Sequence, residues 1–266
     1  MFMMPFARLK PAYWTGVLLA MLTTWQSCKI KDYASDSRPV DHQLWDKLTQ
    51  QHVSAEGWVD YRGFIADSSR LNAYLDLLRQ NHPNDRYWSK DERLAYWINL
   101  YNAFTVKLIV DHYPIPSIKD IKNGIPFINT VWDLKFIQIE GRTYDLNNIE
   151  HGIIRPKFSE PRIHFAVNCA SVSCPRLRNE AYTADKLDQQ LDDQTKRFLA
   201  DTSKNQLFED RLVLSKIFNW YGSDFTSGSN TVLGFIRKYT DQPIAQNPKI
   251  AYLPYNWALN DQPTAD

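Results

Sequence analysis

One long predicted helix, residues 90–113 with an apolar segment at residues 94–110, constrains the fold of this chain more narrowly than any other part of the sequence. Ser89 and Glu92, three residues apart, form a capping box that marks the start of a helix. Pro114 and Pro116 follow the segment and would end the helix. The segment is apolar on nearly every side of the predicted helix, which is typical of a helix buried at the centre of a domain.

Two asparagines, Asn99 and Asn102, interrupt this apolar segment three residues apart, so they share one face of the helix. Burying an amide without hydrogen-bond partners costs about 1–3 kcal/mol, so both side chains should have partners. Two interpretations remain open. The amides hold the backbone of a neighbouring loop in place, or they orient a catalytic or substrate group from inside the core.

The rest of the chain mixes helices and short strands without a regular βαβ rhythm, and no internal repeats are visible. This pattern predicts an α+β fold. We expect one globular domain over residues 40–266, with helices packed on a small, mostly antiparallel sheet. Strands are expected at residues 136–140, 143–146, 163–167 and 211–214.

The N-terminus has the anatomy of an export signal. Arg8 and Lys10 precede an apolar run at residues 14–25, which is too short to span a bilayer comfortably. The run leads to Cys28, as in a bacterial lipoprotein signal, although Trp25 stands where an aliphatic residue is usual. We predict a signal peptide at residues 1–27, lipidation of Cys28 and a tether at residues 28–39. The protein would then be anchored in the cell envelope, facing the periplasm or the exterior.

The charge balance gives no electrostatic case for nucleic-acid binding. The formal net charge of the whole chain is +1, and losing Arg8 and Lys10 with the signal peptide would bring it to −1. The sequence also contains no glycine-rich phosphate loop, no G-x-S-x-G elbow and no H-E-x-x-H helix. Several common enzyme classes therefore lack support, and no cofactor or metal is predicted.

The segment PRIHFAVNCASVSCP, residues 161–175, gathers the side chains best suited to chemistry near neutral pH. It holds His164, Cys169 and Cys174, together with Asn168 and Ser173. If residues 163–167 form a strand, His164 and Asn168 share its polar face by two-residue periodicity. Cys169 would then lie where the chain leaves the sheet.

Four interpretations compete for the two cysteines. Either thiol is a nucleophile served by His164 or His151, or the pair is redox-active, although C-x-x-x-x-C is looser than the C-x-x-C pattern. With both histidines they would form a Cys2His2 zinc set, which no tight spacing supports. In an oxidising compartment, Cys169 and Cys174 would instead form a structural disulfide once Cys28 carries lipid.

A third segment, residues 150–156, places Glu150 and His151 ahead of Arg155. A glutamate–histidine pair followed by an arginine can supply a base and an anion clamp. The spacing alone is not diagnostic, because a histidine beside a glutamate is common on protein surfaces.

Five motifs occur in an order that resembles the domain of unknown function 547 family, found in bacteria, plants and animals. They are YWINLYNAFTVKLI, YDLNNIEHGIIRP, PRIHFAVNCASVSCPRL, LSKIFNWYGSDF and YLPYNWALN, and the resemblance covers about residues 70–254. In some eukaryotic relatives the domain is joined to signalling or thiol-redox modules. The resemblance implies that three segments converge on one pocket through Asn99, Asn102, Glu150, His151, Gly152, Arg155, His164, Cys169, Ser173, Cys174 and Pro175.

The leading hypothesis is a cell-envelope lipoprotein with a Cys/His site that hydrolyses or transfers acyl groups on peptide-like amides. Its proposed catalytic residues are Cys169, His164, His151, Glu150, Asn99 and Asn102. The residues expected to bind substrate are Arg155, Asn168 and Ser173. A papain- or transglutaminase-like layout would fit, but those enzymes place the cysteine on the buried helix, ahead of the histidine. The alternatives are a peptide- or glycan-binding module with a disulfide, and a thiol–disulfide redox protein.

Overall fold

A computed structural model of the chain describes residues 35–122, 130–226 and 231–263. The predicted signal peptide, Cys28 and residues 28–34 of the tether lie outside these ranges. The described remainder of the tether, residues 35–39, contains no helix or strand. No helix in the described part of the chain is long and apolar enough to cross a membrane.

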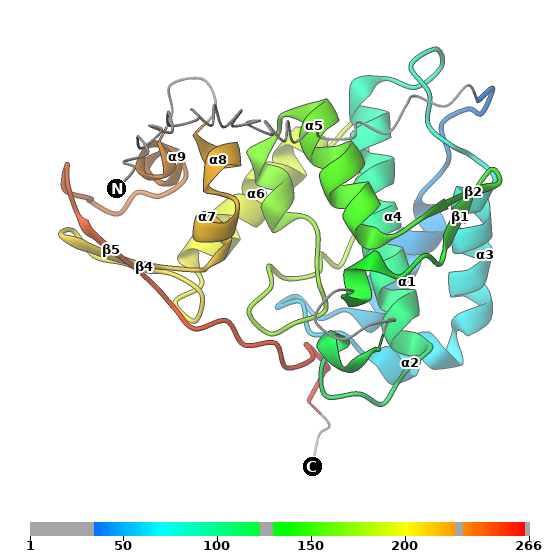
Figure 1. The fold of residues 1–266 in the computed structure, drawn as a ribbon, viewed down its shortest axis with the longest axis horizontal. Coiled ribbons are helices and arrows are strands. Elements are labelled where there is room, and N and C mark those ends of the chain that lie inside the picture. Colours follow the sequence, from blue (N-terminus) through cyan, green and yellow to red (C-terminus); the bar gives the residue numbers. More distant parts are fainter. Residues whose placement is uncertain (1–34, 123–129, 227–230, 264–266) are drawn as a thin grey trace, which may run out of the picture.

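The predicted central helix is confirmed as α4 (Lys90–Val110), and it lies in the middle of the helical part of the molecule (Figure 1). The Ser89 backbone N–H donates to the Glu92 carboxylate over 2.7 Å, and the Glu92 N–H donates to Ser89 Oγ over 3.2 Å. This capping box satisfies two of the otherwise unpaired donors of the first turn. Most of the helix is buried, including Asn99 and Asn102.

Helices and one hairpin surround α4 and close the larger hydrophobic core. The helices are α1 (Gln43–His52), α2 (Tyr61–Ala66), α3 (Ser68–Arg79) and the short turns η1 (Ile118–Asp120) and η2 (Val131–Asp133). The hairpin pairs β1 (Ile137–Ile139) with β2 (Arg142–Tyr144) in antiparallel register. Glu140 and Gly141 both take positive φ in its two-residue turn, a conformation that glycine adopts at little cost.

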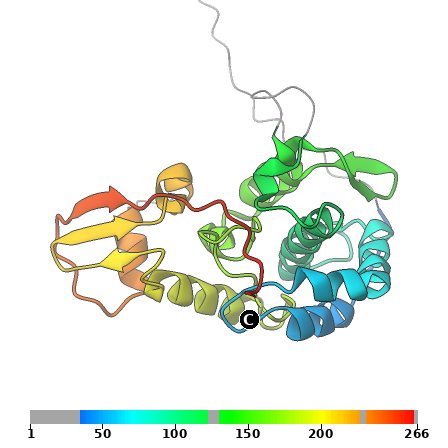
Figure 2. The same cartoon turned by 90° about the horizontal axis from the view of Figure 1, so that it is seen from below.

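A smaller second core lies to one side (Figure 2). Its helices are α6 (Leu187–Ala200), α7 (Ile217–Trp220), α8 (Gly222–Phe225) and α9 (Val232–Lys238). Its strands are β3 (Gln206–Leu207), β4 (Arg211–Leu214) and β5 (Lys249–Tyr252). After β5 the C-terminal segment runs back between the two parts of the molecule (Figure 2). It therefore brings residues from the end of the chain to the middle of the fold.

The α+β class is confirmed, but the strands form two small sheets instead of one. One sheet is the β1–β2 hairpin, and the other has the order β3-β4-β5. The β3–β4 pair is antiparallel and the β4–β5 pair is parallel. The papain- or transglutaminase-like layout stays a prediction.

The predicted strand at residues 163–167 is wrong. Residues 163–165 belong to the 3₁₀ helix η4 (Pro161–Phe165), and residues 166–167 form no strand either. Pro161 presets the first turn of η4, and the Glu160 carboxylate accepts the Arg162 N–H over 3.1 Å. The alternating apolar residues serve two cores, since Ile163 packs in the larger and Phe165 in the smaller. His164 lies between them and is buried, so the expected polar face does not exist.

Candidate functional site

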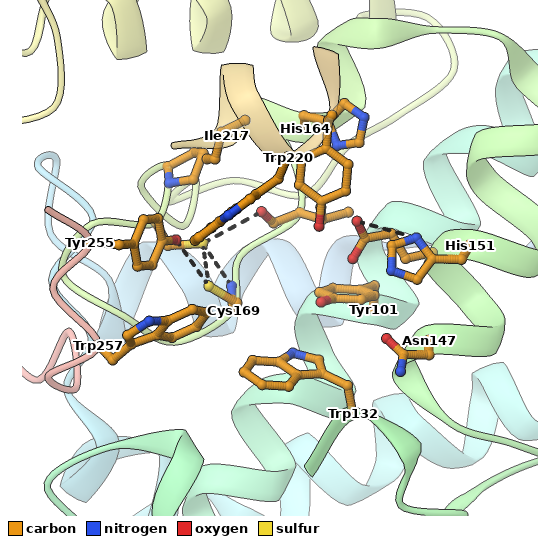
Figure 3. A pocket seen from close by; sticks show the side chains of 15 residues that line it. Tyr101, Trp132, Asn147, His151, His164, Cys169, Ile217, Trp220, Tyr255 and Trp257 are labelled. Atoms are coloured by element: carbon orange, nitrogen blue, oxygen red, sulfur yellow. Dashed lines mark hydrogen bonds and ion pairs between the residues drawn. The ribbon is translucent and has the colours of Figure 1, made fainter. Parts of the chain in front are cut away.

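A cavity of about 280 Å³ lies where the two parts of the molecule meet. Figure 3 shows Cys169, Tyr255 and Trp257 at one end of it, and His151 and Asn147 at the other. The π-helical turn η3 (Asn148–Ile154) supplies the second end. The cavity is lined by Tyr101, Trp132, Asn147, Glu150, His151, His164, Val167, Cys169, Cys174, Pro175, Ile217, Trp220, Tyr221, Tyr255 and Trp257.

Buried amides hold the loop that carries the cysteines. Asn102 Oδ1 accepts the Asn168 N–H over 2.8 Å, and Asn102 Nδ2 donates to the Ala166 carbonyl over 3.0 Å. Asn168 in turn accepts the Ala170 N–H and donates to the Pro175 carbonyl. Ala170 has a φ of 57°, a conformation that costs energy for a residue other than glycine. These bonds compensate that cost and fix the position of Cys169.

The two sulfur atoms, Cys169 Sγ and Cys174 Sγ, lie 2.9 Å apart, and both residues are free thiols. Cys169 is half-buried at the cavity wall, whereas Cys174 is buried. Cys169 Sγ also lies 3.3 Å from Ser171 Oγ and 3.4 Å from the Tyr255 hydroxyl oxygen. The backbone N–H of Cys169 donates to Cys174 Sγ.

These contacts separate the two thiols electrostatically. Hydrogen bonding with Cys174 lowers the pKa of Cys169, and Ser171 and Tyr255 add to the effect, while burial and the charge of Glu150 oppose it. Burial raises the pKa of Cys174 well above its usual range, and Cys169 raises it further. A neighbouring hydrogen-bond donor favours a thiolate, and burial in apolar surroundings favours the thiol. Cys169 is therefore the more easily ionised thiol.

Beside the other end of the cavity, Asp224 ties two segments together. Arg155 holds the carboxylate bidentately, with Nε to Oδ2 at 2.6 Å and Nη2 to Oδ1 at 2.8 Å. His164 Nε2 lies 2.7 Å from Asp224 Oδ2 and must carry the proton, because a carboxylate only accepts. Burial opposes ionisation, but the bonds from Arg155 and His164 hold the pKa of Asp224 well below its usual range.

His164 is also packed against Tyr221. Their rings stack with centroids 4.0 Å apart and an interplanar angle of 24°. His164 Nδ1 is buried and has no hydrogen-bond partner in the described part of the chain. Burial raises the pKa of the Tyr221 hydroxyl, and the Glu150 carboxylate beside it raises the value further.

His151 is the half-exposed imidazole of the site. Its Nδ1 lies 3.0 Å from Arg155 Nη1 and 3.9 Å from Glu150 Oε1. Since arginine only donates hydrogen bonds, this Nδ1 acts as an acceptor and carries no proton. The geometry therefore defines His151 as a neutral imidazole with its proton on Nε2.

The structure brings together part of the predicted site. Cys169, Glu150, His151 and His164 all line the cavity. The expected thiol–imidazole pair is not formed, because no described imidazole nitrogen lies within hydrogen-bonding distance of either sulfur. The expected disulfide is not formed either, since both cysteines are thiols in this structure.

The other predicted site residues lie outside the cavity lining and bond within the protein. Asn99 donates to the Tyr182 carbonyl over 2.8 Å and accepts its N–H over 2.9 Å. Asn102 and Asn168 hold the cysteine loop, and Ser173 Oγ accepts the Asn256 N–H over 2.8 Å. The structure thus supports the interpretation that both helix asparagines hold loops. Their catalytic and substrate-binding roles stay predictions.

The Cys2His2 zinc set finds no geometric support. Across the described ranges, no three or more His, Cys, Asp or Glu side chains are grouped so that they could hold a metal ion. The nearest partner of each histidine in the site is a charged side chain, Asp224 for His164 and Arg155 for His151.

Sequence reasoning did not single out Asp224 or the aromatic residues that complete the cavity. Tyr221 and Asp224 lie in the motif LSKIFNWYGSDF, and Tyr255 and Trp257 lie in YLPYNWALN. Both motifs are part of the family resemblance, and that resemblance was the one indication in the sequence that these residues belong to the site. Nothing in their local spacing indicated that they would meet residues 150–175.

The fold and the cavity together define an α+β domain with a paired-thiol site. Residues 86–199 match the model of a family described as "Protein of unknown function, DUF547", which supports the resemblance over that segment. The matched segment contains both cysteines and both histidines of the site. Neither the curated proteins nor the solved structures contain a match to this chain.

Proposed function

We propose that this domain carries out thiol–disulfide exchange, with Cys169 as the attacking thiol and Cys174 as the resolving thiol. The observation that carries the proposal is the sulfur pair itself. The two Sγ atoms are 2.9 Å apart, one thiol is half-exposed in a cavity, and the other is buried behind it. The lowered pKa of Cys169, due first to hydrogen bonding with Cys174, supports the same division of roles.

The exchange needs no cofactor, because the electrons pass directly from the protein dithiol to the partner disulfide. The Cys169 thiolate attacks one sulfur of a partner disulfide, and the other partner sulfur leaves as a thiolate that takes up a proton. Cys174 then loses its proton and attacks Cys169 Sγ, which releases the second partner sulfur. The partner disulfide is reduced, and the protein dithiol is oxidised to a Cys169–Cys174 disulfide.

Trapping of the mixed disulfide tests this proposal. The reduced protein is mixed with cystamine or glutathione disulfide and weighed by mass spectrometry. We expect the unmodified protein to lose the mass of two hydrogens and retain no probe, because Cys174 resolves the adduct. Cys174→Ser should retain one probe half on Cys169, and Cys169→Ser should react at least tenfold more slowly, since its remaining thiol is buried. Equal rates for the two variants would overturn the assignment of roles.

Acyl transfer on peptide-like amides is the second candidate, and one observation favours it. Glu150 and His151 line the same cavity as Cys169, so an acid or base is available to a substrate bound between them. With p-nitrophenyl acetate as the probe, this function requires a burst that Cys174→Ser keeps and Cys169→Ser loses. Exchange instead requires Cys174 for completion, so the Cys174→Ser protein separates the two functions.

We also propose that the protein is exported and anchored in the cell envelope through lipid on Cys28. The basic start, the apolar run and the cysteine that follows them support this proposal. A Cys28→Ser variant expressed in a bacterial host should move from the membrane pellet to the soluble fraction. A variant that stays in the pellet to the same extent as the unmodified protein would refute the anchor.

A further inference from the structure

The cavity contains a buried carboxylate, Glu150, that no lysine or arginine within the described ranges contacts in an ion pair. The Glu150 side chain is only 8% exposed, and it lines the cavity. His151, its nearest basic neighbour, accepts a hydrogen bond from Arg155 at the nitrogen that faces Glu150, so its imidazole is neutral. No lysine or arginine of the described ranges forms an ion pair with Glu150.

The charge of Arg155 is attracted to Glu150, but the ion pair that Arg155 forms is with Asp224. The Arg155 guanidinium donates two hydrogen bonds to the Asp224 carboxylate. Buried charges in proteins are usually paired, since an isolated one carries a large desolvation cost. Glu150 has the Tyr221 hydroxyl as a hydrogen-bond partner, and a cation from outside the protein would supply the closely paired positive charge.

Aromatic rings form the rest of the wall. Trp220 stacks near Trp257 with ring centroids 6.0 Å apart, and Tyr255 lies 4.8 Å from Trp220. Trp132 meets Trp257 edge-on at 5.5 Å. Trp220 is 44% exposed, which is unusual for so large an apolar side chain. These rings are arranged around a space that an incoming group can reach.

Two rings of the same wall already face cations of the protein. The Lys119 ammonium lies 5.1 Å from the centroid of the Trp257 ring, and the Arg155 guanidinium lies 5.1 Å from that of Tyr221. Both distances are within the range of a cation–π contact. The faces of the tryptophans and tyrosines are thus suited to positive charge.

We propose that the cavity binds an organic cation, with its charged nitrogen near Glu150 and its alkyl groups against Trp132, Tyr101 and Trp220. Aromatic rings with a carboxylate are the ordinary means by which proteins hold alkylated ammonium groups. A volume of about 280 Å³ suits a group the size of choline or a lysine side chain. The inference concerns the ligand and does not depend on the thiol chemistry proposed above.

Titration of the intrinsic tryptophan fluorescence tests this inference, because three tryptophans line the cavity. The probes are choline and its neutral isostere 3,3-dimethyl-1-butanol, with the full chain in its reduced form. We expect choline to bind at least tenfold more tightly than the isostere. Equal affinities, or no saturable change with choline up to high millimolar concentration, would overturn the inference.

Variants locate the site. Glu150→Gln should weaken choline binding at least tenfold and leave binding of the isostere unchanged, whereas Glu209→Gln, an exposed acid outside the cavity, should change neither. Trp132→Ala should weaken both ligands. If Glu150→Gln binds choline as tightly as the unmodified protein, Glu150 is not the counter-charge and the inference fails.

Two control measurements distinguish loss of the ligand site from loss of the fold and from changes in the thiol pair. Circular dichroism and the melting temperature of each variant show whether it is folded, and Glu150→Asp, which retains the charge, should restore most of the binding. The same titration on Cys174→Ser separates the two proposals. Choline binding should persist there within threefold even though exchange cannot be completed, and its loss would tie the cavity's ligand to the thiol pair and contradict the inference.

Discussion

Each end of the cavity holds a half-buried ionisable group, Cys169 at one end and Asp224 beside the other, and the protein stabilises the two groups in different ways. At the thiol end, neutral hydrogen-bonding groups surround Cys169 Sγ: the sulfur of Cys174 and the hydroxyls of Ser171 and Tyr255. Beside the other end, full charges are matched in pairs, and Asp224 is held between Arg155 and His164. A thiol among neutral hydrogen-bonding groups can gain or lose a proton with no change in any ion pair, whereas protonating Asp224 would break the ion pair that holds it.

The comparison separates reactive groups from structural ones. In the proposed exchange Cys169 is the reacting group, because its hydrogen-bond contacts lower its pKa and no ion pair holds it in the described part of the chain. Asp224 and Arg155 form an ion pair with each other. Asp224 also holds His164, and Arg155 also holds His151. The hydrogen-bond contacts of Cys169 Sγ in the described part of the chain are with hydroxyl and thiol groups, and the histidine contact considered in one interpretation of the sequence is not formed.

The largest expected effect is the loss of the reactive thiol. Replacing Cys169 by serine should lower the rate of iodoacetamide alkylation of the folded protein at pH 7 by about two orders of magnitude, because Cys174 is buried and its pKa is raised by burial. Peptide mapping after alkylation measures the rate at each cysteine. If label accumulates on Cys174 as fast as on Cys169, the two thiols do not differ as the structure indicates.

The next effect is on stability. Asp224→Asn removes the charge that Arg155 and His164 share and should cost about 2–3 kcal/mol in the free energy of unfolding. It should leave the alkylation rate of Cys169 within about threefold, because Asp224 bonds Arg155 and His164, while Cys169 Sγ contacts the side chains of Ser171, Cys174 and Tyr255. Urea denaturation measures the first quantity. A large fall in thiol reactivity in a folded variant would show that the ends are coupled.

The stability that the Asp224 carboxylate contributes should decrease at acidic pH. The bonds from Arg155 and His164, working against burial, depress the pKa of Asp224 in the folded state. The stabilisation is therefore fully present above the unfolded value of about 3.9 and is lost as the pH falls toward the folded pKa. The difference between the unmodified protein and Asp224→Asn should stay constant from pH 5 to 7 and shrink below about pH 4.

Asn99 and Asn102 form a matched pair with an intermediate effect. Each is buried and makes two bonds to loop backbone, so replacing either by alanine should cost about 1–3 kcal/mol. Asn102 holds the loop of Cys169, whereas Asn99 holds residue 182, so Asn102→Ala alone should also change the alkylation rate. Parallel denaturation and alkylation of both variants check this, and equal rates would refute a specific role for Asn102.

The smallest effect concerns a single donor. Ser171→Ala removes one hydrogen-bond contact of Cys169 Sγ and should raise the pKa of Cys169 only slightly, since Cys174 and Tyr255 also lower it. Tyr255→Phe should act in the same direction. The midpoint of alkylation against pH reports both, and a lowered midpoint in either variant would contradict the donor role.

The sequence predicted those features that depend on local pattern. The capping box of Ser89 and Glu92 and the apolar helix after it were correct because both signals lie within one element. The strand predicted at residues 163–167 is wrong, because alternating apolar residues indicate a strand only when all of them face the same hydrophobic core. Here Ile163 and Phe165 enter different cores.

The candidate site was predictable only in part, for a related reason. Glu150, His151, His164 and Cys169 could be found because their chemistry is visible in short segments. Asp224 and Tyr255 are 60 or more residues away from the groups they contact. Their positions follow from the second core and from the return of the C-terminal segment, which no local pattern encodes.

The pH dependence of alkylation of Cys169 tests the central claim most directly, when it is compared between the unmodified protein and His151→Gln. Hydrogen-bond activation predicts a midpoint below the ordinary thiol value of about 8.5, and the same midpoint in the variant. A midpoint at or above the ordinary value would contradict the claim. So would a midpoint that rises toward it when His151 is replaced, since an imidazole would then be activating the thiol.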